Sequence, residues 1–120
     1  MRNVTPQVEI EIKIGDELLA AHNHRSHIPF NYMDFISIFK KSNIYVKYLV
    51  VHTPTDIFIS ELEPNARYYC EDIIKEINIC YGEGLLEAGT YDYLAAGKIW
   101  KKYISNKKLN KYMSFRRIEK

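Results

Sequence analysis

Three histidines lie close together in the first quarter of the chain and could bind a metal ion. His22, His24 and His27 fall within six residues. On an extended strand His22 and His24 point to the same side, which allows two imidazoles to share one ion. No Cys or Glu stands at a supporting spacing, and a polar loop accounts for the same residues. A small metal-dependent hydrolase built on this cluster is therefore our third hypothesis, and we expect no bound metal.

A fourth histidine is followed by hydroxyls and a carboxylate. Residues 52–56 read His-Thr-Pro-Thr-Asp. A histidine near a carboxylate can act as a general base that the acid orients. Catalysis also needs a positioned nucleophile and an oxyanion stabiliser, and the sequence assigns neither. Because Thr, Pro and Asp all favour turns, we predict a turn here and no catalytic residue.

Isolated arginines lie in an otherwise acidic body. Residues 1–97 carry eight Lys or Arg against fourteen Asp or Glu, a net charge of −6. Arg25 follows two of the histidines, and Arg67 precedes Tyr68 at the start of a predicted helix. The planar donors of a guanidinium match a phosphate, and a neighbouring aromatic ring can stack on a base. We predict that Arg25, Arg67 and Tyr68 contact an anionic ligand, with ordinary surface salt bridges as the alternative.

The C-terminal part of the chain is strongly basic. Residues 98–120 carry nine Lys or Arg against one Glu, a net charge of +8. Such an asymmetry indicates an anionic partner or a contact between acidic and basic regions of two copies. Cations interleaved with aromatic rings serve phosphates and bases together. The ligand-binding residues predicted in this region are Lys98, Lys101, Lys102, Lys108, Arg116 and Arg117.

The elements that must position these residues alternate between strand and helix patterns. Residues 8–14 alternate β-branched and charged side chains, which is typical of a strand with one solvated face. Gly15-Asp16 favours a tight turn after it, and Asn31 is a suitable helix N-cap. The elements predicted in this half are strands at 8–14 and 17–22, a helix at 31–41, and strands at 44–51 and 57–61.

Two helices are predicted to follow and to form a helical hairpin. The first begins near residue 64 and ends at Gly82 and Gly84, because glycine commonly terminates helices. Thr90 is suited to cap the last helix, which we place at 91–108. The apolar stripes of the two helices bear Tyr, Trp and Ile in excess of what one small sheet covers. We therefore predict a homo-oligomer that forms through residues 66–108.

The order ββαββαα predicts an α+β fold with a four-stranded, mostly antiparallel sheet made of two hairpins, covered on one face by helices. A length of 120 residues with 47% hydrophobic and 27% charged residues fits one domain with its own core. We place this single domain at residues 1–109. We expect residues 110–120 to form a basic, mobile C-terminal tail.

The sequence also predicts where the protein resides. No apolar run is long enough to span a membrane, and the first residues lack a signal-peptide pattern, so we expect a cytoplasmic protein with no membrane partner. Cys70 and Cys80 lie on one predicted helix, about 15 Å apart along its axis. A disulfide cannot span that distance, and we expect free thiols.

Together these observations favour a small non-enzymatic binding protein, oligomeric, that recognises a nucleotide or nucleic acid. The alternative is a protein-interaction module or inhibitor that binds a partner protein. No glycine-rich phosphate loop is present, since Gly82-Glu83-Gly84 lacks the rest of that motif, so we expect no cofactor. The abundance of Ile, Lys, Tyr and Asn is typical of an A+T-rich genome, and we expect an accessory protein of a phage or mobile element.

Overall fold

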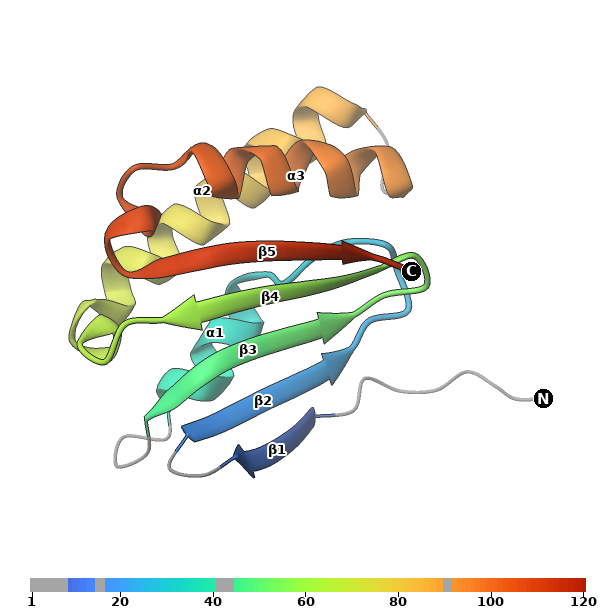
Figure 1. The fold of residues 1–120 in the computed structure, drawn as a ribbon. Helices are drawn as coiled ribbons and strands as arrows, with labels where there is room; N and C mark the ends of the chain where they lie inside the picture. The colour runs from blue at the N-terminus through green and yellow to red at the C-terminus, as the bar shows by residue number, and fades with distance from the viewer. Residues whose placement is uncertain (1–8, 15–16, 41–44, 90–91) are drawn as a thin grey trace.

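A computed structural model describes residues 9–14, 17–40, 45–89 and 92–120 of the chain. In these ranges five strands form one sheet in the order β1-β2-β3-β4-β5, and the helices pack on one of its faces (Figure 1). The strands are β1 (Glu9–Ile14), β2 (Glu17–Asn23), β3 (Val46–His52), β4 (Asp56–Leu62) and β5 (Met113–Glu119). The helices are α1 (Tyr32–Phe39), α2 (Cys70–Ala88) and α3 (Tyr93–Ser105), with short 3₁₀ turns at Ala66–Tyr69 and Leu109–Lys111.

The sheet is mixed because one helix connects two parallel strands. β1 with β2, β3 with β4, and β4 with β5 pair antiparallel, whereas β2 and β3 run parallel with α1 as the crossover between them. The α+β class, the two predicted hairpins and the mostly antiparallel sheet are confirmed. The turn predicted at Gly15-Asp16 lies outside the described residues.

The fifth strand occupies the segment where we expected a mobile tail. β5 pairs with β4 along its whole length, from Leu62 opposite Met113 to Asp56 opposite Glu119. Met113 is buried and Phe115 packs against the core. We predicted a tail because of the Lys and Arg residues in this segment. Its side chains nevertheless alternate as in a strand, and every second one lies on the covered face. The sheet therefore has one strand more than the four predicted.

The helix over 31–41 begins where the sequence predicts. The Asn31 side chain accepts hydrogen bonds from the backbone N–H groups of Met33 and Asp34, at 2.9 and 3.4 Å. The Asp34 carboxylate in turn accepts from the Asn31 N–H at 2.8 Å. This reciprocal capping box satisfies N–H groups that no carbonyl in the helix can reach. It also holds Asp34 in one orientation.

The helix predicted to end at Gly82 and Gly84 continues through both residues. α2 ends at Gly89, which has a φ of 68° in the left-handed region that favours glycine. Gly84 serves packing instead, because a Cβ there would lie 2.6 to 2.8 Å from atoms of Ile99 on α3. The last helix starts with Asp92 as its N-cap, and Thr90 lies outside the described residues.

The core lies between the sheet and the three helices. The apolar stripes that we expected to exceed the sheet bury residues such as Ile73, Ile77, Ile99 and Trp100 against it. Other large apolar side chains of the same helices stay exposed, among them Leu86, Leu94 and Ile104. The oligomer through residues 66–108 stays a prediction. Cys70 and Cys80 are free thiols, as predicted. Within the described ranges, no helix is both long enough and apolar enough to cross a membrane.

The contact between α2 and α3 predicts opposite effects for two nearby alanine substitutions. Gly84→Ala should lower the free energy of unfolding by about 2 kcal/mol, because the methyl group overlaps Ile99. Gly82→Ala, with nothing within 4 Å of the new Cβ, should raise it by about 0.5–1 kcal/mol through helix propensity. Urea unfolding measures both, and equal effects would show that α2 and α3 do not meet at Gly84.

Candidate functional site

Polar side chains gather at one end of the sheet. The parallel strands β2 and β3 end there at Asn23 and His52, and the β3–β4 turn and the end of β5 lie beside them. Backbone hydrogen bonds join these segments, from His24 N–H to the His52 carbonyl at 2.7 Å and from Lys120 N–H to the Thr55 carbonyl at 2.9 Å. Residues far apart in the sequence thus meet at this end.

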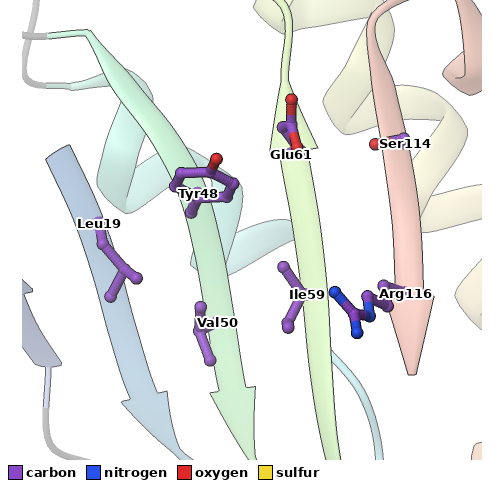
Figure 2. A pocket seen from close by; sticks show the side chains of 7 residues that line it. All are labelled: Leu19, Tyr48, Val50, Ile59, Glu61, Ser114 and Arg116. Carbon is purple, nitrogen blue, oxygen red and sulfur yellow. The ribbon is translucent and has the colours of Figure 1, made fainter. Parts of the chain in front are cut away.

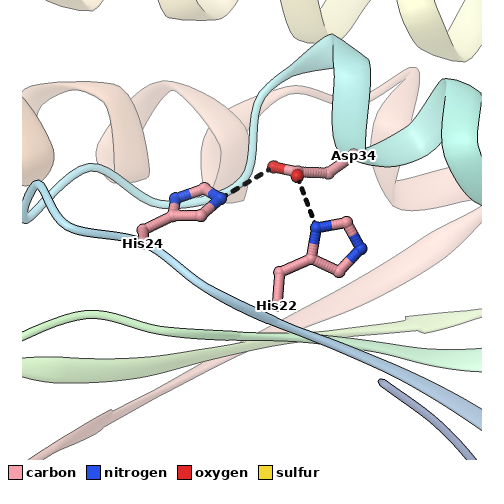
Figure 3. A group of neighbouring side chains, drawn as sticks. All are labelled: His22, His24 and Asp34. Atoms are coloured by element: carbon pink, nitrogen blue, oxygen red, sulfur yellow. Dashed lines mark ion pairs between the residues drawn. The ribbon is translucent and has the colours of Figure 1, made fainter. Parts of the chain in front are cut away.

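Two of the three clustered histidines meet a carboxylate from α1 (Figure 3). His22 Nδ1 lies 2.8 Å from Asp34 Oδ1, and His24 Nε2 lies 3.3 Å from Asp34 Oδ2. His22 and His24 point to the same side, as we predicted, and that side is the helix-covered face. The side chains of His22, His24 and Asp34 are 4%, 8% and 2% exposed, so the group is shielded from water.

The contacts within this group stabilise the ionised form of Asp34 and the protonated form of His24. Burial by itself would raise the pKa of Asp34, but hydrogen bonds from His22 and His24 hold that pKa well below its usual range. Burial lowers the pKa of His24, but the hydrogen bond and the charge of Asp34, together with the bond to the Ile28 carbonyl, outweigh it, so the net shift is upward. The second ring nitrogen of His24, Nδ1, donates to the Ile28 carbonyl at 3.0 Å.

His27 does not join this group. Its Nδ1 lies 3.1 Å from Thr55 Oγ1, and its ring meets the ring of Tyr93 edge to face at a centroid distance of 5.7 Å. The third member of the group is therefore Asp34, and not His27 as the sequence suggested. The sequence signal for Asp34 is its position in the capping box, three residues after Asn31.

A second buried carboxylate lies in the β3–β4 turn predicted at residues 52–56. Asp56, 1% exposed, accepts hydrogen bonds from Arg117 Nε and Nη2 at 2.9 and 3.3 Å and from the Thr55 hydroxyl at 2.8 Å. Burial opposes ionisation of Asp56, but the bonds from Arg117 and Thr55 keep its pKa below the ordinary value. The Arg117 guanidinium also lies 5.6 Å from the centre of the Phe58 ring. Arg117 thus supports the fold from the covered side of the sheet.

The other predicted ligand-binding residues are spread over the molecule. Lys102 pairs with Glu87, and Lys108 lies 3.7 Å from Glu76. Arg67 stacks over the ring of Tyr68 and donates to its hydroxyl at 3.1 Å. Arg25, Lys98, Lys101 and Arg116 are exposed. Lys98, Lys101 and Lys102 all lie on α3. The hydrogen bond from Lys102 and the charges of all three lower the pKa of Glu87. Arg25, Arg67 and Arg116 lie on other parts of the chain, so the structure groups only some of the predicted cations.

The sheet face that carries no helix contains a hollow of about 490 Å³ (Figure 2). Cross-strand register arranges its lining in two rows. One row runs Leu19, Tyr48, Glu61 and Ser114, and the other contains Val50, Ile59 and Arg116. Of this set only Arg116 is among the ligand-binding residues predicted from sequence. Residues 44–51 are almost continuously apolar, so the sequence offers no signal for which of their side chains lie on the uncovered face.

Comparison with family models, curated proteins and solved structures finds no match to the chain. The function therefore has to be inferred from the geometry of these residues.

The neighbours Arg116 and Arg117 should differ sharply in their effect on stability. Arg117→Met should lower the free energy of unfolding at pH 7 by about 2–3 kcal/mol, because the buried Asp56 carboxylate loses its cation. Arg116→Met, a matched control on the exposed face, should change it by less than about 0.5 kcal/mol. Guanidinium chloride unfolding monitored through Trp100 measures both, and similar losses would contradict the assigned faces.

The stabilisation by Arg117 should also depend on pH. The folded-state pKa of Asp56 is lowered, so its contribution is present above the ordinary Asp pKa of about 4 and is lost as the pH falls toward the folded value. The difference in stability between the native chain and Arg117→Met should therefore shrink below about pH 4. A difference that stays constant down to pH 2.5 would show that the ion pair does not form.

Proposed function

We propose that the protein is a small non-enzymatic binding protein and that the hollow on the uncovered sheet face binds a nucleotide, either free or within a single strand. The observation that carries this proposal is the combination of an aromatic ring, a carboxylate and a guanidinium, from Tyr48, Glu61 and Arg116, around one open hollow. Each group matches a different part of a nucleotide.

Tyr48 provides a surface on which a base can stack. It lies on β3, near the centre of the sheet, and its side chain is half-buried on the uncovered face. The Lys47 ammonium lies 5.3 Å from the centre of its ring, which adds positive charge beside it. Stacking of a base on an aromatic side chain contributes about 1–3 kcal/mol and tolerates every base.

Arg116 is suited to the phosphate. Its side chain is exposed and lies beside Ile59 in Figure 2, on the opposite face from the buried pair that Arg117 makes with Asp56. The planar fork of a guanidinium donates two parallel hydrogen bonds to phosphate oxygens. Since strand alternation alone separates Arg116 from Arg117, one arginine binds the ligand and the other holds the strand.

Glu61 and Ser114 are suited to a base edge. Both are exposed and lie directly opposite each other on β4 and β5, and Tyr48 is the partner of Glu61 on the other side. A carboxylate accepts hydrogen bonds from amino and imino groups, which guanine presents side by side, whereas uracil has a single imino N–H between two carbonyls. We therefore infer a preference for guanine over uracil.

The apolar part of the lining supports the main rival. Leu19, Val50 and Ile59 would also suit a partner protein, as in the protein-interaction alternative. A nucleotide is favoured because the hollow has the volume of a small-molecule site and combines its apolar floor with few convergent polar groups. Binding experiments distinguish the nucleotide from the partner protein.

Binding of a fluorescent, guanine-containing single-stranded RNA should be measured by anisotropy, with guanosine monophosphate and oligouridine as competitors. We expect Tyr48→Ala to weaken binding about tenfold through lost stacking. Arg116→Met should weaken it similarly and reduce the slope of affinity against salt by about one ion, since one phosphate contact is lost. Glu61→Gln should diminish the preference for guanine.

Arg67→Met is the matched control, because it removes an exposed arginine outside the hollow. Competition by the mononucleotide would identify a free nucleotide as sufficient, whereas competition by the unlabelled guanine-containing RNA alone would identify a single strand. Absence of RNA binding by the native chain, or an equal loss in Arg67→Met, would contradict the proposal and favour the partner protein.

A further inference from the structure

The buried His22–His24–Asp34 group contains the donor atoms of a transition-metal site. Two imidazole nitrogens and a carboxylate oxygen lie within 4.8 Å of one another. Around a tetrahedral ion with metal–ligand bonds near 2.0 Å, neighbouring donors lie about 3.3 Å apart. The distance from His24 Nε2 to Asp34 Oδ2 is 3.3 Å, and that from His22 Nδ1 to Asp34 Oδ1 is 2.8 Å. Small side-chain movements would accommodate an ion.

Groups outside the donor set orient it, as is usual around bound metals. His24 Nδ1 donates to the Ile28 carbonyl at 3.0 Å, which directs Nε2 toward Asp34. Asp34 Oδ2 accepts from the Asn31 N–H at 2.8 Å. Such outer hydrogen bonds hold metal-binding histidines and carboxylates in position. Both ring nitrogens of His24 thus face oxygen acceptors, so a cation between His24 and Asp34 would take the place of a proton.

The end of β2 and the start of α1 bring these donors together. His22 lies in β2, His24 follows its last residue Asn23, and Asp34 lies in the first turn of α1, which the capping box holds. Both imidazoles and the carboxylate are buried on the covered side of the sheet. Nitrogen donors and a shielded position suit Zn²⁺ and its first-row neighbours, whereas Mg²⁺ and Ca²⁺ prefer oxygen donors and keep water.

We propose that His22, His24 and Asp34 bind one divalent first-row transition-metal ion. Three protein donors leave a coordination position for water or a small ligand, as in metal sites that are not purely structural. The ion would join the end of β2 to the start of α1. This site is separate from the nucleotide hollow, since its side chains lie on the covered face and the hollow lies on the uncovered face.

The site can be tested with Zn²⁺ and Co²⁺ on the purified full chain after treatment with a chelator. Competition with a chromogenic chelator should give one Zn²⁺ per chain, and Co²⁺ should show the visible absorption of a four- or five-coordinate ion. His24→Ala should weaken Zn²⁺ binding at least about 100-fold, since loss of an outer partner alone costs 10- to 100-fold. His27→Ala, which removes a histidine outside the group, should bind as the native chain does.

Asp34→Asn is a second variant that should still fold, because its amide oxygen can accept the hydrogen bond from the Asn31 N–H. It removes only the negatively charged metal donor. With far-UV circular dichroism matching the native chain, it should also lose Zn²⁺ binding. Zn²⁺ should raise the melting temperature of the native chain and of His27→Ala, but not of Asp34→Asn. A folded native chain that binds no Zn²⁺ or Co²⁺, or His24→Ala that binds as tightly as His27→Ala, would overturn the proposal. Neither outcome bears on RNA binding by the uncovered face.

Discussion

The ring of Phe30 is the contact on which the arrangement of the layers depends. It is fully buried and lies between 5.4 and 6.0 Å, centroid to centroid, from the rings of Phe35, Trp100, Tyr103 and Phe115. Its backbone carbonyl accepts a hydrogen bond from the Tyr103 hydroxyl at 2.7 Å. These partners come from α1, α3 and β5, so one residue of a connecting loop joins two helices to the last strand. Aromatic pairs in such offset and edge-to-face geometries add to the free energy of burial.

Because this cluster gathers the helices on one side, the two faces of the sheet have different chemistry. On the covered face, polar groups need partners, and Asp56 has them in Arg117 and Thr55. On the uncovered face, side chains such as Tyr48 and Arg116 remain available to a ligand. The two adjacent arginines of β5 show how strand alternation alone places one side chain in a buried ion pair and the next on the exposed face.

Asp34 links local and tertiary structure through a single carboxylate. It closes the capping box that starts α1 and also receives His22 and His24 from the end of β2. Since α1 is the crossover between two parallel strands, its starting point determines where the chain returns to the sheet. The hydrogen bonds from these donors hold the pKa of Asp34 low, so its carboxylate stays ionised at the covered end of the sheet.

The sequence by itself determined the strands with clear alternation, the helix that begins at Asn31, and the α+β class, because each depends on neighbours within a few residues. Tertiary structure decided the rest. Residues 113–119 become a strand only beside β4, and Gly84 stays within α2 because Ile99 of another helix lies against it. Asp34, rather than His27, meets the other two histidines since the crossover places α1 above β2. Packing between distant segments determines which face of the sheet a side chain occupies and which residue it contacts. A local sequence pattern contains no information about that packing.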